Sequence, residues 1–161
     1  MAIIESRDFT LEELFGYFYV VRAYQREYVW EEKHVNDLLS DVYIQFDENK
    51  SGSDWEYFIG SIIVCESKNV YELIDGQQRM TTICLILCAI RDVLQELEPN
   101  KSLDALKKLI SSSITDRNGN EKFRDRIELQ YDEDSRKVLE NIASKQEYND
   151  IPENSSVERI K

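Results

Sequence analysis

The stretch that most constrains how this chain folds is Asp-Gly-Gln-Gln-Arg at residues 75–79, which lies between two apolar segments. Residues 71–74 are typical of the end of a β-strand. Residues 80–97 are so apolar that they predict a helix buried on most of its faces. The motif therefore occupies the C-terminal end of a strand and the first turn of a helix. Backbone N–H groups and the helix dipole favour an anion at such a junction.

Two residues of the motif strengthen the interpretation that this strand–helix junction binds an anion. Gly76 allows a sharp turn and a close approach of a ligand to the backbone, and Arg79 offers a fork of donors that suits phosphate. The alternative is an ordinary Asp-Gly turn followed by a solvated first helical turn. A motif this short does not decide between the two by itself.

Composition and charge limit the classes of protein to consider. With 161 residues and 42% hydrophobic residues, the chain is expected to form one globular domain or slightly more. The net charge of −12 argues against non-specific DNA binding by this segment, although it leaves room for a small basic site.

The N-terminal residues, the apolar runs and the cysteines indicate the cellular compartment of the protein. Charged residues at positions 5, 7 and 8 argue against a signal peptide, and the longest apolar run, residues 83–90, is too short to span a bilayer. Three cysteines without a disulfide-like framework favour a reducing compartment, so we expect a cytoplasmic protein. Cys84 and Cys88 are expected to be buried core residues and not half of a metal site.

Up to residue 100 the pattern indicates helices and a hairpin in an α+β order. Thr10 and Glu13 fit a capping box that opens a short helix, and residues 19–21 are typical of extended chain. An amphipathic helix is expected from Glu31, with an apolar face that runs to Phe46. Residues 57–65 and 70–74 predict a hairpin, in which Gly60 indicates close approach of a backbone or ligand. The following helix is expected to end before residue 99, a proline.

After residue 100 the pattern changes. A helix is expected at residues 103–110, a second hairpin around a turn at residues 117–120, and a polar helix from about 132 to 141. Residues 155–158 are typical of a helix start that does not continue. We therefore expect a domain at residues 1–100 and a hairpin with the start of a truncated helical extension at residues 101–161, as the N-terminal part of a longer protein.

Several standard sites are missing from the sequence. It has no P-loop, no Gly-x-Ser-x-Gly elbow and no His-Glu-x-x-His pair. The single histidine, His34, lies on the predicted surface of the second helix, so Ser/His/Asp catalysis is not expected.

The remaining candidates for a functional site are two Gln-Arg segments and one carboxylate. Residues 25–26 and 77–79, with Asp75, suit a phosphorylated ligand, because guanidinium groups fork onto phosphate and amides hold a base edge or a water. Tyr24, Tyr28 and Trp30 offer a stacking face for a base, or else pack in the core. Asp37 and Asp41 share a helix face that would hold Mg²⁺, or else is a solvated acidic surface.

Four motifs in a fixed order carry a family resemblance. They are Tyr-Gln-Arg-x-Tyr-x-Trp at residues 24–30, Asp-Leu-Leu-x-Asp at 37–41, Phe-Ile-Gly-Ser-Ile at 58–62, and Ile-Asp-Gly-Gln-Gln-Arg-Met-Thr-Thr at 74–82. Together they resemble the N-terminal domain of GmrSD-type, modification-dependent type IV restriction endonucleases. The match is good over residues 5–97 and weaker around residues 126–140. Four ordered motifs are specific, whereas the central one alone would not be.

This resemblance implies a ParB/sulfiredoxin-like fold, with a small mixed sheet packed against helices, and a domain that binds and hydrolyses a nucleoside triphosphate with Mg²⁺. Such a domain regulates DNA cleavage by a separate HNH-type nuclease domain, placed downstream or on a partner chain. A single histidine cannot supply that nuclease here. DNA would be contacted only through the full-length protein, and no membrane is involved.

The family's site residues carry over by position. One departure is Glu27, where relatives often have proline, which makes the loop less rigid and brings a negative charge closer to the phosphates. The residues that carry over by position to the nucleotide site are Gln25, Arg26, Asp75, Gly76, Gln77, Gln78 and Arg79. Within the site we expect catalysis by Asp75, Gln77, Gln78 and Arg79 and nucleotide binding by Tyr24, Gln25, Arg26, Trp30, Gly76, Thr81 and Thr82. We expect metal binding by Asp75, joined by Asp37 and Asp41 if their helix face meets the site.

Two other functions remain open at this stage. In the first, the same pocket holds a nucleotide without turnover, and its occupancy closes the domain or joins two copies into a homodimer. In the second, the chain is a protein-interaction module, and residues 75–79 only cap the buried helix.

Overall fold

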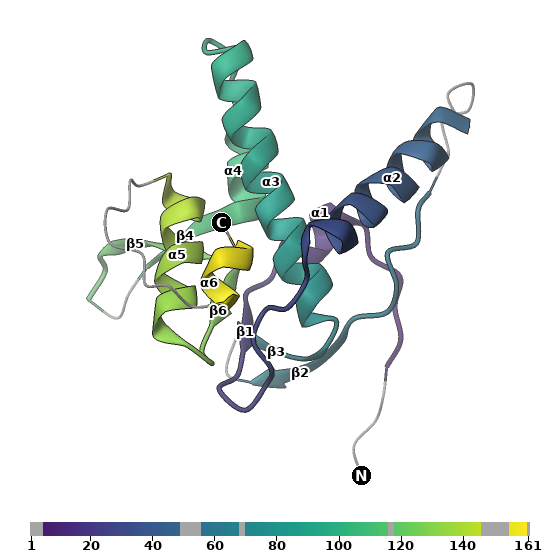
Figure 1. The fold of residues 1–161 in the computed structure, drawn as a ribbon. Coiled ribbons are helices and arrows are strands. Elements are labelled where there is room, and N and C mark those ends of the chain that lie inside the picture. The colour runs from purple at the N-terminus through teal and green to yellow at the C-terminus, as the bar shows by residue number, and fades with distance from the viewer. Residues whose placement is uncertain (1–4, 49–55, 68–69, 116–117, 146–154, 161) are drawn as a thin grey trace.

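The computed structural model describes residues 5–48, 56–67, 70–115, 118–145 and 155–160. In this part of the chain, six helices and two sheets form the α+β fold that the sequence predicts (Figure 1). The helices are α1 (Leu11–Leu14), α2 (Glu32–Glu48), α3 (Gln77–Leu97), α4 (Asp104–Ile110), α5 (Glu133–Ser144) and α6 (Ser155–Ile160), and the strands are β1 (Tyr19–Val21), β2 (Ile63–Ser67), β3 (Val70–Asp75), β4 (Ser111–Thr115), β5 (Glu121–Asp125) and β6 (Ile127–Leu129).

The larger sheet has the strand order β2-β3-β1-β6. Strand β1 is parallel to both of its neighbours, whereas β2 and β3 form the predicted antiparallel hairpin. All three residues of β1 are buried, as expected for a short apolar strand with parallel strands on both sides. Strands β4 and β5 form the second predicted hairpin as a separate two-stranded sheet.

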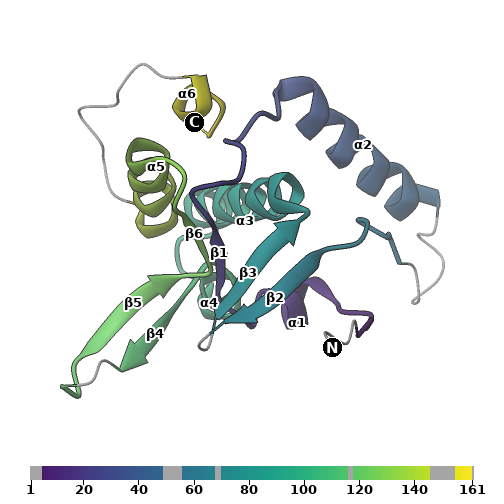
Figure 2. The ribbon, with the colours of Figure 1, turned by 90° about the horizontal axis from the view of Figure 1, so that it is seen from below.

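Helix α3 lies over one face of the larger sheet and also packs against α4 and α5 (Figures 1 and 2). Its first half supplies the centre of the core, because Met80, Cys84 and Leu87 meet apolar side chains of the strands and of α5. Cys84 and Cys88 are both almost completely buried, which confirms them as core residues. The predicted capping box is also confirmed, because Thr10 and Glu13 cap α1 reciprocally. Asp132 caps α5, the polar helix expected from about residue 132.

Two predictions about the elements were wrong. The strand expected at residues 57–65 begins only at Ile63, because Gly60 has a φ of +97° and interrupts the extended chain. The second half of α3 is not buried on most faces: Ile90, Val93 and Leu97 are exposed where the helix extends beyond the sheet. Helix α2 forms as expected, and none of its residues is buried.

Strand β6 was not predicted from the residue pattern. This strand has only three residues and follows β5 without a turn motif, yet it pairs with β1 in register from Tyr19 opposite Ile127 to Val21 opposite Leu129. Residues after 100 therefore complete the same sheet and core as residues before 100. The division at residue 100 stays a prediction, because a shared sheet does not test where a domain ends.

Folding alters the protonation of the Asp125 carboxylate, which lies at the end of β5. Burial and, to a lesser extent, the nearby Glu140 carboxylate raise the pKa of Asp125 to about 6. Because this folded-state pKa lies above the ordinary value, protonation favours the folded state. The corresponding stability is fully present below about pH 4 and is lost as the pH rises through about 6.

We expect Asp125→Asn to become more stable relative to wild type as the pH rises, because the amide cannot ionise. If the pKa of Asp125 is higher by one in the folded state than in the unfolded state, the free energies of unfolding of the two proteins differ by about 1.4 kcal/mol. Screening by solvent makes this difference smaller. Urea unfolding of both proteins at about pH 4 and about pH 7 measures this difference. Carboxylates with lowered pKa, such as Glu72 and Asp92, titrate alike in both proteins and cancel. A difference independent of pH would contradict the assignment.

Candidate functional site

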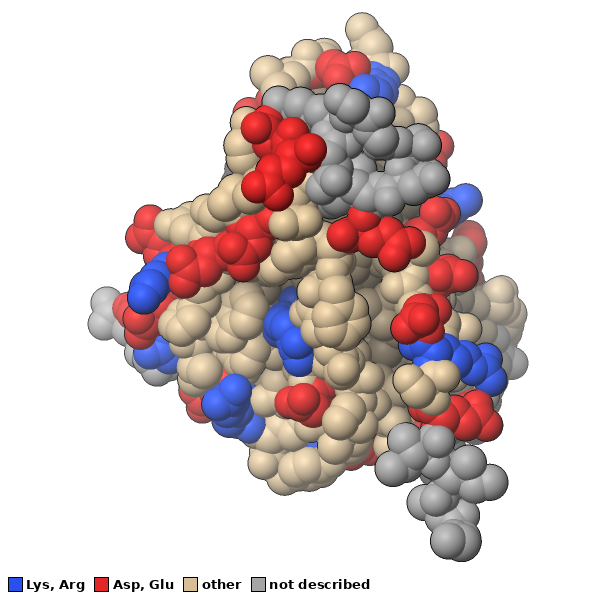
Figure 3. Space-filling model, turned by 90° about the vertical axis from the view of Figure 1, so that its right-hand side faces the viewer, with Lys and Arg blue, Asp and Glu red and all other residues tan. Residues whose placement is uncertain are grey.

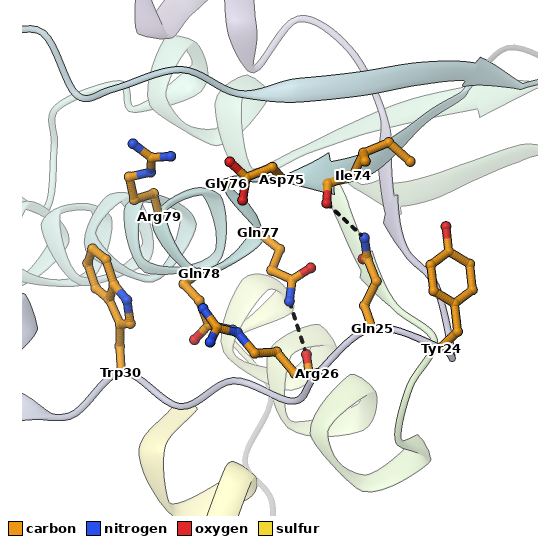
Figure 4. Close-up of a pocket in the computed structure, with 10 residues that line it drawn as sticks. All are labelled: Tyr24, Gln25, Arg26, Trp30, Ile74, Asp75, Gly76, Gln77, Gln78 and Arg79. Carbon is orange, nitrogen blue, oxygen red and sulfur yellow. Dashed lines mark hydrogen bonds between the residues drawn. The ribbon is translucent and has the colours of Figure 1, made fainter.

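A cavity of about 520 Å³ lies where β3 passes into α3 (Figure 4). The loop between β1 and α2 forms one wall, and the junction motif forms the other. The two Gln-Arg segments, about fifty residues apart in the sequence, thus meet at one site, as the sequence predicts. The lining residues are Tyr24, Gln25, Arg26, Trp30, Ile74, Asp75, Gly76, Gln77, Gln78 and Arg79.

Gly76 shapes the junction. It precedes the first turn of α3 with a φ of +89°, a conformation that favours glycine. A Cβ atom at this position would lie 2.5 Å from Ile62 Cδ1, so a larger residue would also collide with a neighbour. Among the residues that the structure describes, no side chain caps α3, and the first turn of this helix contains no acidic residue. The N-terminal N–H groups of α3 are therefore left for an anion.

Three glutamine side chains fasten the loop to the junction. The buried Gln78 uses both ends of its amide: Nε2 donates to the Glu27 carbonyl oxygen at 3.0 Å, and Oε1 accepts from the Val29 N–H at 2.8 Å. Gln77 Nε2 donates to the Arg26 carbonyl oxygen at 3.2 Å, and Gln25 Nε2 donates to the Leu73 carbonyl oxygen. These amides replace the strand-like pairing that the two backbones do not make.

Arg79 lines the cavity, but its guanidinium donates to backbone carbonyl groups. Its Nη1 donates to the Ile59 carbonyl oxygen at 3.1 Å and its Nη2 to the Ser61 carbonyl oxygen at 2.8 Å. Figure 4 shows the guanidinium turned away from the loop that carries Arg26. The close approach that Gly60 indicated is made by this guanidinium, because a Cβ atom on Gly60 would lie 1.7 Å from Nη1.

Thr81 and Thr82 are buried on α3 and do not line the cavity. Thr82 Oγ1 donates to the Gln78 carbonyl oxygen at 2.9 Å and lies 2.7 Å from the Tyr28 hydroxyl. Burial raises the pKa of Tyr28, whose ring is in the core. Of the two interpretations of Tyr28, core packing is therefore the one that the structure supports.

Tyr24 and Trp30, the other two aromatic residues of the predicted stacking face, lie at opposite ends of the cavity in Figure 4. The Tyr24 hydroxyl donates to Glu72, which also accepts from Arg22 Nε at 3.0 Å, and the hydrogen bond to Glu72 raises the pKa of Tyr24. Trp30 stacks on His34, with ring centroids 5.9 Å apart. The two rings therefore do not sandwich one base. Neither Glu72 nor Arg22 was predicted from the sequence to lie beside the site. The signal that could have indicated Glu72 is a carboxylate within the otherwise apolar strand β3.

Three polar groups of the cavity have no partner among the described residues. The Arg26 guanidinium and the Asp75 carboxylate are exposed, and neither makes an ion pair or hydrogen bond there. Gln25 Oε1 is buried and also lacks a hydrogen-bond partner in that part of the chain. A cation, an anion and an acceptor are thus free to meet a ligand, whereas the other polar side chains of the motif mostly hold the walls.

The predicted metal ligands are not gathered in one place. Asp75 is the one carboxylate among the lining residues, while Asp37 and Asp41 are exposed on α2 and do not line the cavity. Asp41 Oδ2 accepts a 3.4 Å hydrogen bond from the Tyr57 hydroxyl. Within the described ranges, no cluster of three or more His, Cys, Asp or Glu side chains could hold a metal ion.

A model of one protein family matches nearly the whole chain. It is described as the GmrSD restriction endonuclease, N-terminal domain, and it matches residues 9–161. The chain belongs to this family. The match confirms the resemblance carried by the four motifs and extends it over the residues after 100. Membership makes the chain part of a restriction, or phage-defence, system.

Two other findings complete the comparison. A search of curated proteins finds no match to this chain. Among the helices that the structure describes, none combines the length and the apolar character needed to cross a lipid bilayer.

We expect Gly60→Ala to destabilise the protein more than Gly119→Ala does. Both glycines have a positive φ, so both substitutions cause similar backbone strain. Around Gly119 the space for a Cβ atom is open, whereas at Gly60 the Arg79 guanidinium must leave its carbonyl partners. The loss of these charge-assisted hydrogen bonds should add about 1–3 kcal/mol, measured by urea unfolding. Equal losses would show that Arg79 does not stabilise this segment.

Proposed function

We propose that this domain binds a nucleoside triphosphate between the loop of residues 24–30 and the N-terminus of α3, hydrolyses it, and thereby regulates DNA cleavage by a nuclease domain located elsewhere. The observation that carries the proposal is the state of Arg26. Of the two arginines that line the cavity, Arg79 is committed to backbone carbonyls, while the Arg26 guanidinium has no partner among the described residues. The site residues and their roles are part of the proposal.

The cavity offers an anion two kinds of donor. Arg26 would neutralise and fork onto phosphate oxygens, and the uncapped N-terminus of α3 would add backbone N–H groups. The whole chain has a net charge of −12, so many carboxylates were available to pair with this arginine. An arginine left unpaired beside an open helix N-terminus, within the described part of such an acidic protein, is well explained by an anionic ligand.

Other groups suit the base and the sugar. Gln25 Oε1 would accept a hydrogen bond from an N–H or hydroxyl group of the ligand, and this would satisfy a buried acceptor that lacks a partner among the described residues. Trp30 would provide one aromatic face beside the phosphates. Gln78, Arg79 and Thr82 act as positioning residues, because their polar groups already hold the walls.

The donor set of the cavity also fits Mg²⁺ carried by the nucleotide. Mg²⁺ often binds through one or two carboxylates together with waters and phosphates, and Asp75 would supply such a carboxylate. When bound, the ion would neutralise phosphate charge. In hydrolysis, water attacks the terminal phosphorus and the bond to the bridging oxygen breaks, giving a nucleoside diphosphate and phosphate. Arg26 would stabilise the charge that develops on the phosphate oxygens.

We expect nucleotide binding to be lost in Arg26→Ala without a loss of stability, because the guanidinium supports no described part of the fold. In wild type, a nucleotide at about a hundred times its dissociation constant should stabilise the fold by about 2.7 kcal/mol. Thermal unfolding with ATP, GTP, CTP and UTP, with and without Mg²⁺, measures this effect. Arg7→Ala is the matched control, since Arg7 is an exposed arginine that pairs with the neighbouring Glu5 and does not line the cavity. If no nucleotide stabilises wild type, the proposal fails and the motif is a structural cap.

We expect Asp75→Asn to abolish hydrolysis while the domain stays folded, because the exposed carboxylate makes no hydrogen bond or ion pair with the described residues. Release of phosphate by the two purified proteins measures the effect. Hydrolysis by Asp75→Asn at the wild-type rate would contradict the role of Asp75. Binding without hydrolysis in wild type would favour the switch, in which occupancy closes the domain or joins two copies.

A further inference from the structure

The two ends of the cavity differ in the residues that form them (Figure 4). Tyr24, Gln25 and Ile74 lie at one end, and Trp30 lies at the other. The proposed donors to phosphate, which are Arg26 and the N-terminus of α3, lie between the two ends. A nucleotide with its phosphates at these donors would extend its base toward one end, and the chemistry of the ends decides which.

The end at Trp30 offers a base little free aromatic surface. The Trp30 ring is half-buried, packs against the hydrophobic core and is stacked on His34. The guanidinium at this end belongs to Arg79 and donates to backbone carbonyl oxygens. Only part of one ring is therefore open to a ligand there.

The end at Tyr24 combines exposed apolar surface with an unsatisfied acceptor. Tyr24 is 72% exposed and Ile74 is 46% exposed. Gln25 Nε2 donates to the Leu73 carbonyl oxygen, which fixes the orientation of the amide. The Oε1 atom of Gln25 is then buried without a hydrogen-bond partner among the described residues. A ring, an aliphatic surface and an acceptor suit a nucleobase, because every base has a π-face and an N–H donor on its edge.

The exposed Tyr24 ring is held in place by a network of polar side chains. Its hydroxyl donates to Glu72 Oε1. Glu72 Oε2 accepts from Arg22 Nε at 3.0 Å, and Arg22 Nη1 donates to Gln130 Oε1 at 3.2 Å. Glu72 and Ile74 are two residues apart on β3, so both point to the same face of the strand. A ring that is already held beside Ile74 loses less conformational freedom when a ligand stacks on it.

The charge of the protein makes contacts with a base valuable. The chain has a net charge of −12, and acidic side chains are spread over the face of the molecule in Figure 3. The field of such a protein opposes the approach of a polyphosphate. Contacts with an uncharged base add affinity that this field does not oppose.

We propose that Tyr24, Ile74 and Gln25 form the base subsite of the nucleotide site, and that Glu72 is a positioning residue for the Tyr24 ring. The base stacks on Tyr24 beside Ile74, and an N–H group of the base donates to Gln25 Oε1. Trp30 lies at the opposite end. This inference rests on the proposed function, because it requires a nucleotide in the cavity.

Calorimetry with two ligands, each with Mg²⁺, tests the base subsite. One ligand is the tightest-binding of ATP, GTP, CTP and UTP, and the other is inorganic tripolyphosphate, which has no base. Wild type should bind the nucleotide at least about tenfold more tightly than tripolyphosphate. Tyr24→Ala should lose this preference and bind tripolyphosphate as wild type does. Tyr43→Ala is the matched control and should keep the preference, because Tyr43 is 64% exposed on α2 and does not line the cavity.

A double-mutant cycle tests the role of Glu72. Tyr24→Phe keeps the ring and removes the hydroxyl, and Glu72→Ala removes the acceptor. Each change should weaken nucleotide binding about threefold. The double variant should also bind about threefold more weakly, and not about ninefold, because the same hydrogen bond is lost in all three proteins. Affinity for tripolyphosphate should stay at the wild-type value, which would not hold if Glu72 only supported the fold.

Four results would overturn the inference. A wild-type preference retained in Tyr24→Ala would place the base elsewhere, and equal weakening of both ligands would show that Tyr24 only shapes the loop. Additive effects in the double variant would remove the role of Glu72. Tripolyphosphate that binds wild type as tightly as every nucleotide would overturn the base subsite alone. If wild type binds neither ligand, the proposed function fails, and the inference fails with it.

Discussion

The site depends on one interaction above all: side-chain amides join a loop to a strand–helix junction that is distant in the sequence. Gln25, Gln77 and Gln78 each donate to a backbone carbonyl oxygen on the opposite wall. Gln78 also accepts from a backbone N–H, so its buried amide acts like a short piece of β-ladder. Backbone groups that are withdrawn from water require partners, and these amides provide them without a regular strand.

This constraint divides the polar residues that line the cavity into two groups. Residues that support the walls have little hydrogen-bonding capacity left, as Gln78 and Arg79 show. Residues that support nothing are free for a ligand, as Arg26 and Asp75 are among the described residues. A functional site often combines such a rigid frame with a few unpaired groups, because binding then requires little reorganisation. Nucleotide binding to this cavity remains our proposal, and the frame explains why so few side chains would carry it.

Helices α2 and α3, which extend outward, show a second division within the molecule, between buried and exposed apolar residues. The first half of α3 is in the core, whereas its second half and the whole of α2 expose apolar residues. Local pattern predicts the same amphipathic helix in both situations, because periodicity reports which residues share a face and not what covers that face. The predicted period of α2 is correct, and none of its residues is buried.

The local elements and the family can be recognised from the residues alone. Capping signals at Thr10 and Asp132, the hairpin pattern and the glycine at residue 76 act over a few residues, so they need no tertiary contacts to be identified. Which polar residues are committed to the walls could not be predicted in this way. The partners of Gln78 and Arg79 lie about 50 and about 20 residues away along the chain, and the three residues of β6 pair only because β1 offers an edge. Hydrogen bonding is short-ranged and directional, so a side chain's role depends on groups that only folding brings within reach.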